Sequence, residues 1–319
     1  MRVVRYHELG EPGVLQVDEV DRPTPAADEV LVGMRAASVN PVDTMFRSGE
    51  YGDVTTPAIP GGDGAGTVVE VGADVDAFDV GDRVFASGMG HADGGTFAEY
   101  VAFPTIKLAR LPGGVPFEVG GAVGNVGATA WTALEAIAGI ATGDRVLVHG
   151  GAGGVGHVAV QIAASAGADV VATVGSDDVR DRVRELGATD ALFYGSDTLA
   201  DDVVAATGGA GVEVVLDHML GEYLELDCEV LASGGQIVTI AGDIPPTGGA
   251  ALRDKEITLR GMSLGNRTER SDILQRLARL LERGDLTAVV ADTYEFEDVS
   301  QAHRDVLAGG YLGKLLVTP

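Results

Sequence analysis

The chain has 319 residues, of which 48 are Asp or Glu and 22 are Lys or Arg, so its formal net charge at pH 7 is −26. A charge of this sign and size disfavours nucleic acid or an anionic membrane surface as a partner. Hydrophobic residue types make up 45% of the chain, which excludes a disordered acidic tail and predicts a packed globular protein.

The acidic excess comes with only three lysines, Lys107, Lys255 and Lys314. This balance predicts a salt-rich cytosol, where counterions screen the repulsion among the carboxylates; the alternative is an ordinary acidic protein. The chain has no apolar run of membrane-spanning length and no charged-then-apolar leader, so we expect a cytoplasmic protein without membrane insertion. Its one cysteine, Cys228, rules out an internal disulfide and is predicted to be a small buried residue.

In chain order, residues 1–122 show short apolar runs between clusters of Gly, Pro and Asp, which predict a mainly-β domain. From Val123 onward helical and strand patterns alternate, with strands expected near 145–149, 169–174, 191–194, 212–217, 235–240 and 257–261. This alternation predicts an α/β fold with a doubly wound, six-stranded parallel sheet. The expected strands of the first part are Glu29–Ala37, Gly66–Val71, Asp82–Ala86 and Phe97–Phe103.

The last part of the chain returns to the first domain. Ser271–Gly284 carries leucines on one helical face and charged residues on the other, and Gly284 is a typical terminator. Tyr311–Val317 is predicted to be a strand. We therefore expect one domain from residues 1–122 and 265–319, with a second domain, residues 123–264, inserted into it.

Arg145–Ser176 is the most informative segment for function. It is predicted to form a strand, a glycine turn, a helix over Val155–Ala166 and a second strand. The G-x-G-x-x-G spacing in this context is typical of a dinucleotide site, because the glycines allow a tight turn, close approach of a pyrophosphate and close helix packing. The helix also directs free N–H groups at the phosphates. The predicted phosphate loop comprises Gly151, Ala152, Gly153, Gly154, Val155 and Gly156.

The end of the second strand indicates which dinucleotide binds. A site for NAD places a carboxylate there, whereas a site for NADP supplies a cation. Here the strand ends at Val174, Gly175 and Ser176, and Arg180 follows one turn later. Asp177 and Asp178 leave NADH as the alternative, but the pattern favours NADPH.

Seven motifs together resemble the zinc-independent quinone oxidoreductase branch of the medium-chain dehydrogenase/reductase superfamily, which includes zeta-crystallin. The resemblance runs essentially end to end and implies a GroES-like catalytic domain, a Rossmann domain and a cofactor in the cleft between them. The motifs are NPVDTMFRSGEY (40–51), PAIPGGDGAGTVVEVG (57–72), VGDRVFA (80–86), GTFAEY (95–100), GATAWTAL (127–134), GDRVLVHGGAGGVG (143–156) and GKLLV (313–317).

The zinc-dependent relatives of this family carry a cysteine near the position of Asn40 and a Gly-His-Glu run near Gly62 and Asp63. This chain has neither, and it lacks a four-cysteine loop after about residue 90. We therefore expect no metal. The histidines, which show no ligand spacing with Cys228, are His7, His91, His149, His157, His218 and His303.

Asn40, Asp43, Arg47 and Tyr51 recur every three or four residues, so a short helix would present them on one face toward the cleft. In the alternative reading Asp43 and Arg47 form an ion pair on the helix surface. The resemblance implies that Asn40 and Tyr51 lie near the nicotinamide and the substrate. It also implies that Thr129, in the GATA turn expected to open a helix, bonds the cofactor, although a helix N-cap would look the same. We assign catalytic roles to Asn40, Asp43, Tyr51 and Thr129. The predicted cofactor site, besides the phosphate loop, comprises Asn40, Thr129, Gly175, Ser176, Arg180, Tyr194, Gly242, Asn266 and Lys314.

These observations predict an enzyme that transfers a hydride from NADPH to a quinone without a metal. Reduction of the double bond of enones, alkenals or enoyl thioesters is the alternative within the family. A non-catalytic NADPH-binding protein is the alternative from another class.

The sequence also predicts a homodimer. The segment Glu256–Leu264 is expected to be the edge strand of the Rossmann sheet, and only Glu256 and Arg260 are charged in it. An exposed edge with so little protection favours pairing with a second copy. Cover by a loop or by the Ser271–Gly284 helix is the alternative.

Overall fold

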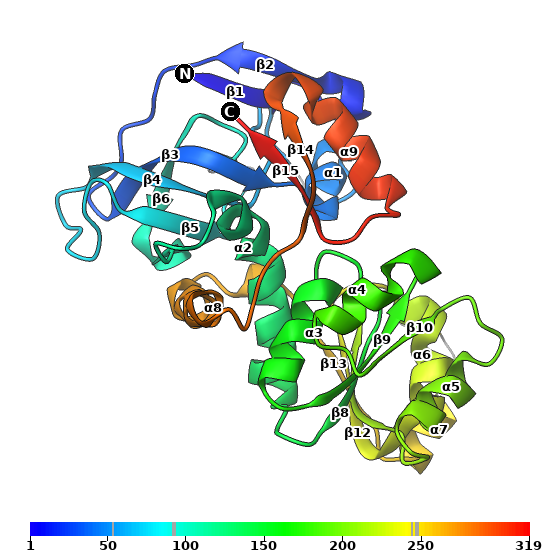
Figure 1. Cartoon of the computed structure of the whole chain (residues 1–319). Coiled ribbons are helices and arrows are strands. Elements are labelled where there is room, and N and C mark those ends of the chain that lie inside the picture. The colour runs from blue at the N-terminus through cyan, green and yellow to red at the C-terminus, as the bar shows by residue number, and fades with distance from the viewer. Residues whose placement is uncertain (53, 91–93, 244, 246–248) are drawn as a thin grey trace. The chain divides into compact units, whose positions relative to one another are not determined.

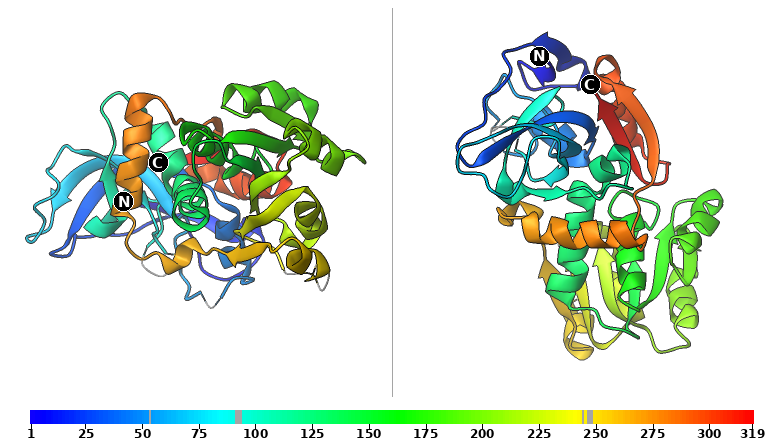
Figure 2. Two further views of the ribbon diagram at one scale, coloured as in Figure 1. Left: turned by 90° about the horizontal axis from the view of Figure 1, so that it is seen from below. Right: turned by 60° about the vertical axis from the view of Figure 1, so that its left-hand side comes forward.

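The computed structural model describes residues 1–52, 54–90, 94–243, 245 and 249–319. The chain forms two compact units (Figure 1): unit 1 comprises Met1–Ala128 and Arg267–Pro319, and unit 2 comprises Thr129–Asn266. The first and last residues both belong to unit 1, as the blue and red ends of the ribbon show in Figures 1 and 2. The predicted domain limits at 122/123 and 264/265 stay a prediction.

Unit 1 is mainly β, as the sequence predicts for a GroES-like domain. Its large sheet has the order β14-β15-β3-β4-β5-β7, and β6 pairs with β3 as well. β1 and β2 form a separate antiparallel pair. The strands are β1 (Arg2–Tyr6), β2 (Leu15–Glu19), β3 (Glu29–Ser38), β4 (Asp63–Val71), β5 (Arg83–Ser87), β6 (Tyr100–Pro104), β7 (Leu108–Arg110), β14 (Val290–Glu295) and β15 (Lys314–Thr318).

β3 is the strand around which unit 1 is built. It pairs antiparallel with β4, β6 and β15, and the β15 register brings Leu316 opposite Ser38. Tyr6, Phe97 and Phe103 are fully or almost fully buried in the adjoining core. This packing holds the end of β3 and the start of β15 together, and these two strand ends carry Asn40 and Lys314. The α-helices that lie wholly in this unit are α1 (Pro41–Ser48), α8 (Ser271–Arg283) and α9 (Val299–Ala308), and most of α2 (Phe117–Trp131) belongs to it as well.

Unit 2 is a doubly wound α/β fold. Within the described residues its six strands are all parallel, in the order β10-β9-β8-β11-β12-β13. Figure 1 shows α3 and α4 on one face of this sheet and α5 and α6 on the other. This is the predicted Rossmann sheet, with β13 at its edge. The strands are β8 (Arg145–Val148), β9 (Asp169–Val174), β10 (Asp190–Phe193), β11 (Val212–Asp217), β12 (Leu231–Thr239) and β13 (Thr258–Gly261), and the helices are α3 (Gly156–Ser165), α4 (Arg180–Glu185), α5 (Leu199–Ala206), α6 (Leu220–Val230) and α7 (Gly249–Asp254).

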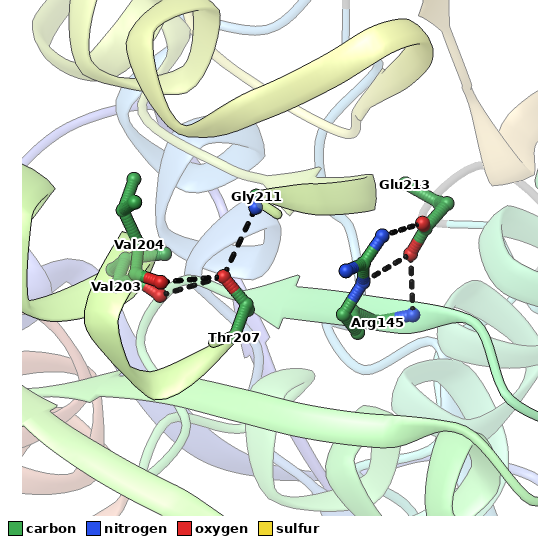
Figure 3. Close-up of polar contacts among 6 residues, drawn as sticks. All are labelled: Arg145, Val203, Val204, Thr207, Gly211 and Glu213. Atoms are coloured by element: carbon green, nitrogen blue, oxygen red, sulfur yellow. Dashed lines mark hydrogen bonds and ion pairs between the residues drawn. The ribbon is translucent and has the colours of Figure 1, made fainter. Parts of the chain in front are cut away.

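Polar contacts at the amino ends of β8 and β11 join neighbouring strands (Figure 3). Both the backbone N–H and the Nε of Arg145 donate to Glu213 Oε2, at 2.7 and 3.0 Å, and a further bond joins Arg145 Nη2 to Glu213 Oε1. Thr207 Oγ1 accepts from the Gly211 N–H at 3.1 Å and donates toward the end of α5. These bonds secure the end of the sheet opposite the glycine-rich loop.

The structure corrects several predicted limits. Phe97 and Ala98 do not belong to β6, because Phe97 bonds Val4 and Pro60 and Ala98 bridges to Val3. β15 begins at Lys314 and not at Tyr311, since the preceding residues form a bend. The sequence did not predict β1, β2, β7 or β14.

Thr129 does not open a helix as we expected. It lies well inside α2 (Phe117–Trp131), which continues into a π-helix over Thr132–Ala138. Tertiary packing overrides the low helix propensity of Gly127 and Thr129, since a Cβ on Gly127 would lie 2.8 Å from a Leu277 methyl carbon; an N-cap role for Thr129 is therefore wrong. The apolar Cys228 is buried, as predicted. None of the helices within the described ranges is long and apolar enough to cross a bilayer.

Candidate active site

The glycine-rich loop of unit 2 lies between β8 and α3 and is bonded to β9. The Gly150 N–H donates to Thr173 Oγ1 at 3.0 Å, and the Gly151 N–H donates to the Thr173 carbonyl at 2.7 Å. The Gly153 N–H closes the turn on the Gly150 carbonyl at 2.7 Å. The loop therefore has a defined shape set by β9, in the position the motif predicts.

Two of the glycines leave no room for a side chain. A Cβ on Gly156 would overlap the Gly150 carbonyl oxygen, and a Cβ on Gly151 would lie 2.7 Å from the Cβ of Ala172. Gly156 is also the first residue of α3, so the loop leads directly into the positive dipole end of this helix. The loop therefore suits the pyrophosphate of a dinucleotide, for which close helix–strand packing and exposed N–H groups are needed.

The residues predicted to select the dinucleotide follow β9 and β10. Gly175 and Ser176 are exposed at the end of β9, and the first carboxylate after this strand end is that of Asp177. Arg180 begins α4, and its Nη2 lies 3.3 Å from Asp177 Oδ1. This ion pair is open to solvent at Asp177, so the guanidinium can exchange a surface carboxylate for a phosphate.

Tyr194 lies beside the end of β9. Its N–H donates to the Val174 carbonyl at 3.0 Å, and a Cβ on Gly175 would come within 3.0 Å of the phenol oxygen. The ring is 48% exposed and stacks on Phe193, with the ring centroids 5.7 Å apart. The structure thus brings Tyr194 and Gly175 together, and leaves an aromatic face open at this edge.

Gly242 and Asn266 are both exposed. Gly242 follows β12 and packs close to the start of α6, where a Cβ would lie 2.8 Å from the Leu220 nitrogen. Asn266 ends a short 3-10 turn, and its N–H bonds to the Ser263 carbonyl at 3.3 Å. Thr129 is half-buried in α2. The cofactor roles predicted for these three residues stay predictions.

Unit 1 contains a buried polar network centred on Asn40, which is 6% exposed. Asn40 Nδ2 donates to Asp63 Oδ1 at 2.8 Å, and Asn40 Oδ1 accepts from Lys314 Nζ at 2.9 Å. Lys314 Nζ also donates to the Val39 carbonyl at 2.6 Å. β3, β4 and β15 each supply one end of this chain of bonds, so the sheet itself sets the orientation of the Asn40 amide.

The charges in this network are mutually dependent. Burial raises the pKa of Asp63 to about 7, although the Lys314 ammonium and the hydrogen bonds from Asn125 and Asn40 act in the opposite direction. Burial lowers the pKa of Lys314, and Asp63 and Asp43 counteract that effect. Neither ion would be tolerated alone in such a place, since an unpaired buried charge is costly.

A second set of buried residues extends the network, and sequence reasoning missed it. The Asn125 N–H donates to Asp63 Oδ2 at 2.8 Å, and Ser87 Oγ donates to Asn125 Oδ1 at 2.5 Å. Arg270 Nη1 donates to Ser87 Oγ at 2.8 Å, and this arginine is 8% exposed. These residues come from four distant segments, and no short motif links them; a buried Asp in a GGDGAG motif was the only available signal.

Asp43 and Arg47 are buried, at 0% and 3% exposure, so a surface ion pair is wrong. Asp43 forms a capping box with Asn40: its Oδ2 accepts from the Asn40 N–H at 2.8 Å. Arg47 Nη1 donates to the Gly10 carbonyl at 2.7 Å. Tyr51 lies beyond the end of α1, is 49% exposed and packs edge-to-face on Phe46. The structure thus joins Asn40 and Asp43 but leaves the Tyr51 hydroxyl outside the buried network.

Comparison with known proteins agrees with both units. Residues 26–113 match the alcohol dehydrogenase GroES-like domain, and residues 186–317 match a family described as zinc-binding dehydrogenase. The quinone oxidoreductase of Lama guanicoe is 34% identical over 99% of this chain and 97% of its own length. The chain belongs to the quinone oxidoreductase branch of the medium-chain dehydrogenase/reductase family. It is therefore an oxidoreductase.

Two solved structures of this family resemble the chain over its whole length. An NAD-dependent alcohol dehydrogenase has a TM-score of 0.94 at 30% identity, with 100% of both chains covered. The Escherichia coli quinone oxidoreductase complexed with NADPH has a TM-score of 0.90 at 28% identity, again with 100% of both chains covered. The second supports binding of NADP by the fold, and the first shows that the family includes a protein described as NAD-dependent.

The family also includes proteins named for zinc, but the residues around Asn40 do not fit that ion. Zinc takes thiolate, imidazole or carboxylate ligands. Here the side-chain amide of Asn40 is hydrogen-bonded to both Lys314 and Asp63. The buried Lys314 ammonium would also repel a dication at this point. Gly62, near the place of the Gly-His-Glu run of the zinc-dependent relatives, has no side chain. The described residues hold no group of three or more His, Cys, Asp or Glu placed to bind a metal.

Proposed function

We propose that this oxidoreductase reduces quinones with NADPH and without a metal. The observation that carries the proposal is the glycine-rich loop of unit 2, whose close packing suits a dinucleotide pyrophosphate. The proposal includes no metal because the residues around Asn40 in unit 1 do not fit a zinc ion. The similarity to the quinone oxidoreductase of Lama guanicoe supports the choice of acceptor.

The glycine-rich loop would hold the dinucleotide, which when bound would supply a hydride to the quinone, and a proton from solvent would complete its reduction to hydroquinone. Negative charge that develops on the quinone oxygen is delocalised through the ring, so hydrogen bonds can stabilise it in place of a Lewis acid. The exposed Tyr51 hydroxyl is the donor that we assign to this task. Asn40 keeps one acceptor position on Oδ1 beside the Lys314 bond, and with it can hold the cofactor amide. Asp43 serves by capping α1.

The direct test is oxidation of NADPH in the presence of a para-quinone, followed by absorbance at several salt concentrations. We expect turnover with the quinone and slower turnover with enones, alkenals and enoyl thioesters. Faster turnover with one of these would assign the protein to double-bond reduction. Binding of NADPH without turnover of any acceptor would make it a binding protein.

Arg180 should decide between NADPH and NADH. Arg180→Ala should raise the KM for NADPH about 10- to 100-fold and leave the KM for NADH nearly unchanged, because the guanidinium pairs only with the 2′-phosphate. Arg182→Ala is the matched control, since Arg182 lies in the same helix, is exposed and pairs with Glu185. Equal effects of Arg180→Ala on both dinucleotides would refute the assignment.

We propose further that the protein is a homodimer joined through β13. β13 forms the edge of the described sheet, and three of its four residues are exposed. A second copy with the same strand antiparallel would continue the sheet. We also place the protein in a salt-rich cytoplasm, on the basis of its net charge. The molar mass in solution at high salt tests the first proposal, and activity against salt concentration tests the second.

A further inference from the structure

A buried cluster of titratable side chains lies directly behind the glycine-rich loop, and the proposed reaction does not use it. His149, the residue between β8 and the loop, is 2% exposed, and its Nε2 lies 2.8 Å from Oδ1 of the fully buried Asp227 in α6. The His149 ring also stacks on Tyr223 of the same helix, with centroids 4.5 Å apart and planes within 8°. A histidine with this many partners is held in one orientation.

The cluster is connected to the loop through one hydroxyl. Thr173 Oγ1 lies 3.2 Å from His149 Nδ1 and accepts the Gly150 N–H at 3.0 Å. The chain of contacts therefore runs from Asp227 through His149 and Thr173 to the first glycine of the loop. We propose that Asp227, His149 and Thr173 position the glycine-rich loop for the dinucleotide, so that ionisation of this cluster weakens dinucleotide binding.

Several other polar or ionisable groups face this cluster. Asp217, at the end of β11, is fully buried and is the nearest charged neighbour; its Oδ1 accepts the Met219 N–H at 2.6 Å. His218 packs against Gly150, where a Cβ would lie 2.6 Å from its Cε1. The groups that face the cluster are Thr173 from β9, Asp217 and His218 from β11 and its end, and Tyr223, Asp227 and Cys228 from α6, with Glu222 and Tyr194 acting on Tyr223 and Lys255 and Glu225 acting on Cys228.

These surroundings determine the charge at neutral pH. Burial lowers the pKa of His149 to about 4, so the imidazole is neutral. Burial raises the pKa of Asp227 to about 8, and burial together with the Asp227 charge raises that of Asp217 to about 6. The Asp217 and Asp227 carboxyls are hydrogen-bonded to each other, so near pH 7 the pair keeps one proton and carries one negative charge.

Loss of the proton held by this pair places two carboxylate charges side by side behind the loop. The added negative charge opposes binding of an anionic pyrophosphate. The inference rests on the proposed dinucleotide function.

The experiment measures the Kd for NADPH by fluorescence titration at several pH values from about 7 to about 9.5. This range lies above pH about 6, where the 2′-phosphate of NADPH itself titrates. For the wild type we expect Kd to rise on the order of tenfold above pH about 8. Asp227→Asn should show no rise in Kd above pH about 8, because its amide carries no charge at any pH in this range. Glu225→Gln is the control, since Glu225 is exposed on the same helix, and should keep the wild-type profile.

Thr173→Val provides a second test that does not depend on pH. It removes the acceptor of the Gly150 N–H with little change in shape, and should raise Kd about tenfold at every pH, while Thr173→Ser restores it. Any one of three results would overturn this inference and leave the proposed function standing. They are a wild-type Kd that does not change with pH, a Kd of Asp227→Asn that rises as the wild-type Kd does, and a Kd of Thr173→Val equal to that of the wild type. If the wild type bound neither NADPH nor NADH, both this inference and the proposed function would be overturned.

Discussion

Gly156→Ala should raise the Kd for NADPH by about 100-fold or more, because a methyl group at this position overlaps the Gly150 carbonyl oxygen. The loop would have to move by about 1 Å, and a displacement of that size removes several phosphate contacts together. Alanine is otherwise favourable in a helix, so the substitution should not melt α3. Titration of NADPH fluorescence measures the effect, and circular dichroism checks the fold.

Two further glycines provide graded controls. Gly221 is near the start of α6, and a Cβ there would lie 3.4 Å from the Asp243 carbonyl oxygen, so Gly221→Ala should leave binding unchanged. Gly153 has an intermediate clearance of 3.1 Å to the Gly150 oxygen, so Gly153→Ala should have an intermediate effect. If Gly156→Ala bound NADPH as tightly as Gly221→Ala, close packing of the loop would not be a requirement for binding.

The Rossmann half of the fold could be predicted from the sequence because its signals are local. β8, β9 and β11 each contain a run of apolar residues, and Gly151, Gly153 and Gly156 have a spacing that is typical of a tight strand-to-helix turn. The GroES-like half was harder. β7 and β14 are short or exposed edge strands without apolar alternation, and their existence depends on partners far away in the sequence.

The candidate site shows the same division. Gly175 and Tyr194 could be proposed from their positions after strands, and Asn40 from its motif. The Asn40 amide, however, is oriented by Asp63 and Lys314, which are 23 and 274 residues away along the chain. Likewise His149 meets Asp227 across 78 residues. Such pairs are produced by sheet register and helix packing, so no short-range pattern could predict them.

The Asn40 network makes the strongest prediction about stability. Lys314→Met should lower the free energy of unfolding by about 3–5 kcal/mol, because it leaves the buried Asp63 carboxylate without its cation. It should also lower kcat, since Asn40 loses the bond that orients its Oδ1. Lys107→Met removes the same charge from a half-buried site of unit 1 and should change unfolding by less than about 1 kcal/mol.

The sign of the pH dependence distinguishes this mechanism from simple loss of packing. The pKa of Asp63 is raised to about 7 in the folded protein, so attraction to Lys314 contributes only where Asp63 is ionised and is lost as the pH falls through about 7. Urea unfolding should therefore show a larger difference between Lys314→Met and the wild type at pH about 8 than at pH about 5. The double variant Lys314→Met with Asp63→Asn should recover part of the loss at pH about 8, because it removes the unpaired charge. A difference that is equal at both pH values and unchanged in the double variant would mean that Lys314 acts through its hydrocarbon stem alone.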